Sequence, residues 1–376
     1  MTTIAVICPG PPERTPSTYY RFGQYKDLWR EQGIDLMFLP KQELVAEATP
    51  RGSIEAKALD VLGKADLIVN QKCLLSSHLF RQIKSLGKPL FFDFDDLIWH
   101  RAGKDYSFPT QWKVGRRLAR WAKGVDQVIC ANTYLKSALL KKTGVTPVVI
   151  PMSLDLEVWC PRADQDSPMD DRAMERGFQD GGSQADGSQA DALKDDGLDV
   201  GMVRVGWTGS PEYHWLLRQL EPAFIEAQQQ AKCLRFSIHS GVDPRLAFDY
   251  DFIPWRMGNE PDYVKSLDIG LLPMDADSIF SLGKSPIKGL QYLACGVVPV
   301  GNFCGASLDY LSPSNSVSVG DTLESWTDAI VAIVRNKCRR SELRSNGISG
   351  LRNGHGLDHV SQALQSLLLT ETASGS

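Results

Sequence analysis

An α/β protein with two Rossmann-like αβα domains that face each other across a cleft is the architecture indicated by the sequence. Short apolar strands alternate with helical patterns over roughly the first 150 residues, and the same alternation restarts near residue 203. Strands that are apolar throughout and joined by helices are typical of parallel sheets covered on both faces. With 376 residues, the chain is long enough to bury two separate cores.

The first half of the chain predicts one sheet with its helices. Runs of apolar and β-branched residues predict strands over 4–8, 34–39, 67–70, 89–92, 127–131 and 148–150. Between these runs, apolar residues recur every three or four positions, which predicts helices over 19–32, 54–62, 76–86, 111–123 and 134–142. We assign these elements to an N-terminal domain over residues 1–150.

The second half repeats the pattern. Strands are predicted over 203–207, 235–239, 252–254, 269–272, 297–300 and 317–319. Helices are predicted over 212–230, 260–266, 287–295, 323–335, 340–352 and 357–369. We assign residues 201–355 to a C-terminal domain and residues 356–376 to a closing helix and tail.

An interdomain segment over 151–200 separates the two halves. Its stretch from about 163 to 198 contains GSQAD twice, is rich in Gly, Ser, Gln and Asp, and has almost no aromatic residue. Such a composition buries too little apolar surface to offset the entropy of ordering. We therefore expect a disordered insertion that carries no chemistry.

Composition excludes several classes of protein. The net charge of −4 gives no dominant basic field, so a nucleic-acid partner is not expected. The eight cysteines form no CxxC pair, which argues against a disulfide framework or a zinc site. The N-terminus lacks a basic region before its short apolar run, and no run of 18 apolar residues occurs, so we expect a cytoplasmic chain without a membrane span.

One predicted helix, over 111–123, is strongly basic. Its charged and aromatic residues are Lys113, Arg116, Arg117, Arg120, Lys123, Trp112 and Trp121. A basic helix with aromatic residues suits peripheral contact with a membrane surface or with an acidic ligand. A solvated helix face with buried tryptophans is the alternative.

A candidate anion site follows the predicted strand over 269–272. Lys284, Ser285 and Lys288 lie at the start of the next helix, where backbone N–H groups and the helix dipole favour anions. Ligands of open α/β sheets bind at the carboxyl ends of the strands. We expect a diphosphate here, with the Gly209–Ser210 turn as a backbone donor; solvated lysines and a turn without ligand are the alternatives.

Acidic residues mark the carboxyl end of the predicted strand over 89–92. The motif FFDFDDLIW supplies Asp93, Asp95 and Asp96, and Asp93-Phe94-Asp95 matches a DxD pattern whose oxygen atoms suit Mg²⁺ or Mn²⁺. We favour a role without metal for Asp95 and Asp96. Capping of the next segment is the alternative.

Two further residues are expected at the same edge. Arg21, which we place at a helix start, is expected to bind an anion or else to pair with a neighbouring carboxylate. His100, after the acidic motif, is expected to line the cleft.

Three segments resemble the group 1 glycosyltransferases, a retaining family with the GT-B fold. KSPIKGLQYLACGVVPVG resembles the donor-side signature of that family, in which a helix and a small-residue turn precede a strand. IPMSLDLEVWCP, residues 150–161, resembles the interdomain segment, and VGWTGSPE, residues 205–212, resembles the first strand and turn of the donor domain.

The resemblance implies a function and further site residues. It implies transfer of a sugar from a nucleotide-diphosphate sugar to a glycan, lipid-linked or small-molecule acceptor, with no cofactor required, as in polysaccharide biosynthesis. The donor would bind the C-terminal domain, where the loop at Trp255 and Arg256 would meet the base and Gln291 the ribose. The acceptor would bind the N-terminal domain, with Arg21, Asp93 and His100 as contacts. Asp95 or Asp96 would orient the acceptor hydroxyl or act as its base, and Arg21 would grip an anionic acceptor or the donor phosphate.

The chain departs from the family at two positions. The usual pair of glutamates falls on Gly283 and Gln291, and neither is acidic. Lys284 and Lys288 would then supply the charge, making the chain a hexosyl- or other glycosyltransferase. The alternatives are a catalytically silent, sugar-nucleotide-binding partner of a glycosyltransferase complex, and an epimerase or hydrolase on the same fold.

Overall fold

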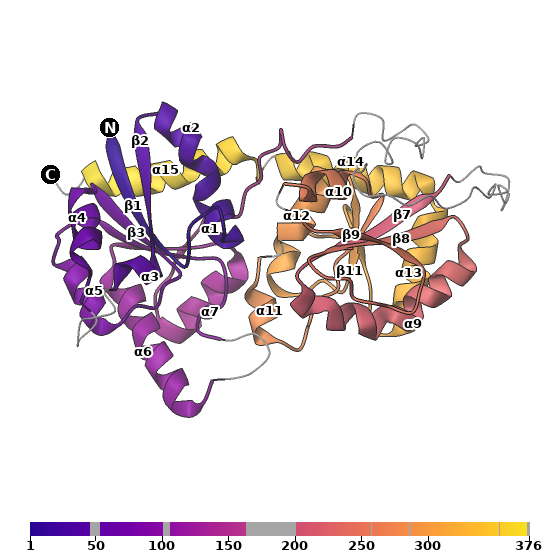
Figure 1. Cartoon of the computed structure of the whole chain (residues 1–376), viewed down its shortest axis with the longest axis horizontal. Coiled ribbons are helices and arrows are strands. Elements are labelled where there is room, and N and C mark those ends of the chain that lie inside the picture. The colour runs from indigo at the N-terminus through magenta and orange to yellow at the C-terminus, as the bar shows by residue number, and fades with distance from the viewer. Residues whose placement is uncertain are drawn as a thin grey trace.

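The computed structural model describes residues 1–45, 53–100, 106–162, 201–256, 258–285, 287–352 and 354–373. Two six-stranded parallel sheets, each flanked by helices, make up two Rossmann-like domains (Figure 1). The predicted architecture is therefore confirmed. The expected insertion over 163–198 lies outside the described residues.

The N-terminal sheet has the strand order β2-β1-β3-β4-β5-β6. Its strands are β1 (Thr2–Cys8), β2 (Ile34–Pro40), β3 (Leu67–Gln71), β4 (Leu90–Phe94), β5 (Gln127–Cys130) and β6 (Val148–Val149). Its helices are α1 (Pro16–Arg21), η1 (Gly23–Tyr25), α2 (Lys26–Glu31), α3 (Lys41–Leu44), α4 (Ala56–Lys64), α5 (Ser77–Lys84), α6 (Phe108–Gly124) and α7 (Thr133–Thr143). Every residue of β3 and β4 is buried, which explains the apolar runs over 67–69 and 90–92 with which they begin.

The C-terminal sheet has the order β12-β11-β10-β7-β8-β9. Its strands are β7 (Val203–Thr208), β8 (Leu234–Ser240), β9 (Tyr250–Pro254), β10 (Ile269–Leu271), β11 (Val298–Gly301) and β12 (Val317–Ser318). The accompanying helices are η2 (Pro211–Tyr213), α9 (His214–Gln230), α10 (Glu260–Lys265), α11 (Ile279–Gly283), α12 (Ile287–Ala294), η3 (Gly305–Asp309), α13 (Leu323–Arg335) and α14 (Lys337–Arg352). The last helix, α15 (Leu357–Ala373), belongs to the N-terminal sheet.

In each sheet, the chain first adds strands on one side of the first strand and then continues on its other side. This change of side occurs at the β1–β3 pair and at the β7–β10 pair. At such a reversal the loops that follow the two strands diverge and leave room for a ligand at the carboxyl edge of the sheet. The two carboxyl edges meet at what we call the interdomain junction, where Tyr20 of α1 contacts Gln291 of α12. This topology positions the candidate site.

Two of the differences from the prediction bear on the candidate site. The helix expected over 19–32 is broken into α1, η1 and α2, since Phe22 has a non-helical backbone with φ −140°. Arg21 therefore ends α1 and does not begin a helix. Strand β4 extends to Phe94, so Asp93 lies within the strand and not after it.

Hydrogen bonds at the start of α7 hold the domains together. Asn132 caps α7 by accepting a hydrogen bond from the backbone N–H of Leu135, and its amide donates to the Ser285 hydroxyl oxygen at 2.8 Å. Asp309 accepts hydrogen bonds from the backbone N–H and the hydroxyl of Thr133, at 2.8 and 2.5 Å. A carboxylate at a helix N-terminus is favoured by the helix dipole, so this contact stabilises the junction.

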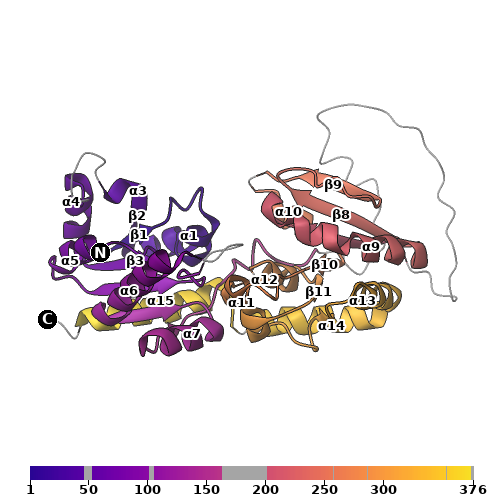
Figure 2. The same cartoon turned by 90° about the horizontal axis from the view of Figure 1, so that it is seen from below.

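The closing helix α15 returns to the N-terminal domain and lies along its sheet (Figure 2). Val360, Leu364 and Leu368 are buried against β1 and α2, and the Trp29 indole donates a hydrogen bond to Ser361 at 2.7 Å. The chain thus crosses between the domains twice. None of the helices over the described ranges is long and apolar enough to cross a membrane.

The docking of α15 predicts a stability effect. Leu364→Ala should lower the free energy of unfolding by ~2–5 kcal/mol, because it leaves a cavity in a fully buried site. Gln362→Ala, at an exposed position two residues earlier on the same helix, should change the free energy of unfolding by less than about 0.5 kcal/mol. Urea unfolding measures both, and equal midpoints for the two variants would contradict the packing.

Candidate functional site

The N-terminal side of the junction contains a buried ion pair. The Arg21 guanidinium contacts both carboxylate oxygens of Asp93, at 2.7 to 3.0 Å, and donates to the Ile150 carbonyl oxygen at 2.6 Å. Their side chains are 2% and 0% exposed. The pair satisfies charges that would be costly to bury alone.

This pairing bears on two predicted acceptor contacts. Of the two roles expected for Arg21, pairing with a neighbouring carboxylate is the one present. Asp93 points into the interior because β4 extends past it, which corrects its expected position after the strand. Contact of either side chain with an acceptor stays a prediction, and it requires the pair to separate.

Asp95 and Asp96 share a lysine that the sequence analysis did not single out. The Lys72 ammonium lies 2.8 Å from Asp95 and 2.5 Å from Asp96. Lys72 directly follows β3 in a left-handed conformation, φ 47°, which side chains rarely adopt. Like Asp95, Lys72 is a charged residue that directly follows a buried strand, and this pattern could have identified Lys72 from the sequence.

Burial determines the protonation of this triad. It raises the pKa of Asp95 to about 6, although Lys72 works in the opposite direction. Burial works to lower the pKa of Lys72, but the two carboxylates outweigh it and raise that pKa above its usual value. Asp96 is the more exposed carboxylate, at 19% against 8% for Asp95, so it is better placed to meet an acceptor.

The C-terminal side brings the two predicted lysines together beside aromatic rings. The Lys284 ammonium donates to the Tyr213 hydroxyl at 3.1 Å and lies 4.7 Å from the centre of that ring. The Lys288 ammonium lies 5.2 Å from the centre of the Trp207 ring. A ring face attracts a cation without neutralising it, so both ammonium groups remain able to bind an anion.

The predicted Gly209 has a packing reason to be glycine. A Cβ there would collide with the Trp207 ring and lie 2.7 Å from the Lys288 ammonium. The absence of a side chain lets Lys288 reach across the turn after β7. Burial and the charge of Lys284 lower the pKa of Lys288 to about 8. Ser210 follows in the same turn and is exposed.

Gln291 lies at the centre of the junction. It is 1% exposed, which excludes the alternative of an ordinary surface residue. Its amide donates to the Tyr20 hydroxyl at 3.0 Å and to Glu260 at 3.5 Å, while its carbonyl oxygen has no hydrogen-bond partner among the residues that the structure describes. An unpartnered buried oxygen is costly unless a ligand satisfies it.

Glu260 was missed by the sequence analysis. It begins α10, and its carboxylate lies 3.5 Å from the Thr208 hydroxyl as well as near Gln291. Burial raises the pKa of Glu260 against the opposing charge of Lys288. A carboxylate therefore stands beside Gln291, where the resembling family has a glutamate. No local spacing signals this, because the contact depends on how α10 and α12 pack.

Gly283, the other departure from the family, packs directly against the N-terminal domain. A Cβ at this position would collide with Leu97 and lie 3.1 Å from Leu135. The Asn132 amide also donates to the Gly283 carbonyl oxygen at 3.2 Å. A glutamate does not fit here in this arrangement, so the departure follows from close contact between the domains.

The remaining predicted residues, Trp255, Arg256 and His100, are more exposed to solvent than Gln291. Trp255, 46% exposed, and the exposed Arg256 follow β9, and the Arg256 backbone N–H donates to Asn259 at 2.9 Å. His100 is half-buried, and its backbone N–H donates to the Leu97 carbonyl oxygen. Over the described ranges, no cluster of three or more His, Cys, Asp or Glu side chains is arranged to hold a metal ion.

Solved structures resemble this chain over its whole length. Sucrose-phosphate synthase from Thermosynechococcus elongatus aligns with a TM-score of 0.68 at 14% identity, covering 100% of both chains. Anabaena HepE, solved in complex with UDP and glucose, aligns with a TM-score of 0.65 at 13% identity, covering 98% of this chain and 99% of that one. A Listeria monocytogenes protein, provisionally a UDP-N-acetylglucosamine 2-epimerase, aligns with a TM-score of 0.58 at 11% identity, covering 100% and 97%.

No protein-family model matches the chain, and no curated protein matches it by sequence. At the identities of the solved structures, the likeness establishes the GT-B glycosyltransferase fold and not an activity. The activity has to be argued from the site.

The Lys72 triad predicts a large effect of a single substitution. Lys72→Met should lower the free energy of unfolding by about 3–5 kcal/mol, because it leaves two buried carboxylates without their cation. Lys64→Met, which breaks an exposed pair with Asp60, should cost less than about 1 kcal/mol. Denaturant unfolding at neutral pH compares them, and a similar cost for both would refute the triad.

Proposed function

We propose that this protein is a glycosyltransferase that moves a hexosyl group from a nucleotide-diphosphate sugar to a glycan or lipid-linked acceptor, with retention of configuration. The observation that carries the proposal is the pair of ammonium groups of Lys284, at the end of α11, and Lys288, in the first turn of α12, which both lie over aromatic rings. Polysaccharide biosynthesis in the cytoplasm is the setting that such an activity implies.

The lysines suit the leaving group. When the bond between the sugar and the diphosphate breaks, negative charge grows on the diphosphate oxygen atoms. Two preorganised ammonium groups stabilise this charge, and the backbone N–H groups at the start of α12 add to the effect. We propose that they take the place of a divalent metal, so that no cofactor is needed.

The rest of the junction would hold the two substrates. The unpartnered Gln291 carbonyl oxygen and the Glu260 carboxylate offer acceptors for the ribose hydroxyls, and the loop at Trp255 would meet the base. On the N-terminal side, Asp96 would accept a hydrogen bond from the acceptor hydroxyl while Lys72 holds it in place. Support for a uridine nucleotide comes from HepE, whose complex contains UDP.

A catalytically silent sugar-nucleotide-binding partner is the second candidate. It is favoured by one observation, the tight packing of Gly283 where the resembling family has a glutamate. Turnover separates the two: the protein is incubated with UDP-glucose and a glycan acceptor, and UDP release is measured. Binding of nucleotide without release would favour the silent partner, and release of free or epimerised sugar without acceptor would favour a hydrolase or epimerase.

Removal of both lysines tests the donor site. UDP, GDP and ADP are titrated by calorimetry with and without Mg²⁺. Lys284→Ala/Lys288→Ala should weaken binding of the preferred nucleotide by about 100-fold or more, since two charge-assisted contacts are lost. Lys232→Ala/Lys337→Ala, with the same charge change at exposed positions of the same domain, is the control. Equal affinity of both double variants would rule out the site.

The lowered pKa of Lys288 predicts a pH dependence of binding. The charged form binds a diphosphate better, so affinity is full below about pH 8 and falls as the pH rises through that value, by up to about tenfold per unit. The phosphates of UDP keep a constant charge in this range. Calorimetry at about pH 7 and about pH 9 should show the fall in wild type and a smaller one in Lys288→Met. The same slope in both would contradict the assignment.

A further inference from the structure

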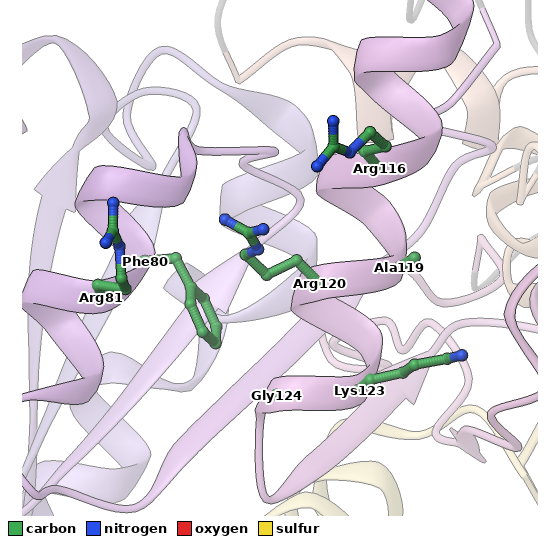
Figure 3. Close-up of a pocket in the computed structure, with 7 residues that line it drawn as sticks. All are labelled: Phe80, Arg81, Arg116, Ala119, Arg120, Lys123 and Gly124. Atoms are coloured by element: carbon green, nitrogen blue, oxygen red, sulfur yellow. The ribbon is translucent and has the colours of Figure 1, made fainter.

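We propose that α6, together with α5, forms a docking surface for an anionic membrane. A groove of about 750 Å³ lies between these helices on the outer side of the N-terminal domain (Figure 3). Four basic residues line it: Arg81, Arg116, Arg120 and Lys123. Arg116 and Arg120 point from α6 toward Arg81 and the Phe80 ring of α5 (Figure 3).

The charge of this groove is not neutralised by the protein. Helix α6 has no Asp or Glu among its seventeen residues. Over the described part of the chain, none of the four basic residues forms an ion pair with a carboxylate, and the Arg81 guanidinium donates only to the Ser77 carbonyl oxygen at 3.2 Å. Unpaired cations gathered on one face create a local positive potential, despite the net charge of −4.

Two large aromatic residues extend the same face. Phe108 is 82% and Trp112 is 57% exposed, in the first two turns of α6. At 100° per residue, they lie with Arg116 and Lys123 on one stripe about 80° wide, whose centre is about 120° from the buried Leu118. The Arg116 guanidinium lies 4.6 Å from the centre of the Trp112 ring, so the aromatic and basic parts of the stripe are continuous.

This combination favours a membrane over a soluble anion. A soluble phosphate needs the cations but gains nothing from an exposed phenylalanine and tryptophan beside them. At a bilayer surface, aromatic rings lie among the headgroups while arginine and lysine attract anionic lipids. Helix α6 also projects from the N-terminal sheet, which leaves its first turns accessible (Figure 1).

The inference rests on the α6 surface alone and not on the proposed transfer reaction. Co-sedimentation tests it with vesicles of phosphatidylcholine and with vesicles of phosphatidylcholine and phosphatidylglycerol in equal amounts. The charge variant is Arg116→Gln/Arg120→Gln/Lys123→Gln, and the aromatic variant is Phe108→Ser/Trp112→Ser. The matched control, Lys232→Gln/Lys337→Gln/Arg352→Gln, removes the same charge from exposed positions of the C-terminal domain.

Wild type and control should bind the anionic vesicles and not the neutral ones, and added salt should release them. The charge variant should lose about 100-fold in vesicle affinity, and the aromatic variant should lose affinity even at low salt. An unchanged unfolding midpoint shows that each variant is folded. Equal vesicle binding by the charge variant and the control would overturn the inference, as would binding of wild type to soluble polyphosphate but not to vesicles.

Discussion

The start of α7 fixes how the two domains meet, and the candidate site depends on that contact. Asn132 and Thr133 bind Ser285 and Asp309 of the C-terminal domain through hydrogen bonds of 2.5 to 2.8 Å. Since Ser285 lies between the two lysines in sequence, this contact also determines where the lysines stand relative to the N-terminal sheet. The same closeness presses Gly283 against Leu97 and leaves no space for a larger residue.

Charge is distributed unequally across the junction. On the N-terminal side, Arg21 is paired with Asp93, and Lys72 with Asp95 and Asp96. On the C-terminal side, the ammonium groups of Lys284 and Lys288 lie over aromatic rings. The Glu260 carboxylate on this side accepts a hydrogen bond from the Gln291 amide. The paired side suits a neutral sugar hydroxyl, whereas the unpaired side suits a diphosphate.

Local patterns in the sequence were sufficient for the architecture and for part of the site. Strand–helix alternation predicted both sheets, and Lys288 lies in the first turn of α12, where the sequence analysis expected it. Lys284 instead follows α11, a short helix that the sequence analysis did not predict. The position of Asp93 was wrong because β4 continues to Phe94, and a shift of that size at a strand end decides whether a side chain faces inward.

The remaining contacts join residues far apart in the chain. Arg21 and Asp93 are 72 positions apart, and Tyr20 and Gln291 are 271 apart. Glu260 reaches Gln291 only because α10 and α12 lie side by side, which no periodicity in either segment signals. The return of α15 to the first domain is likewise a property of the packing, since its apolar residues would suit either sheet.

A crystal structure of the protein with bound UDP would test the central claim most directly. The account predicts that the diphosphate lies within about 3 Å of the Lys284 and Lys288 ammonium groups, with the ribose beside Gln291 and Glu260. A diphosphate bound elsewhere, with both ammonium groups still resting only on Tyr213 and Trp207, would contradict it.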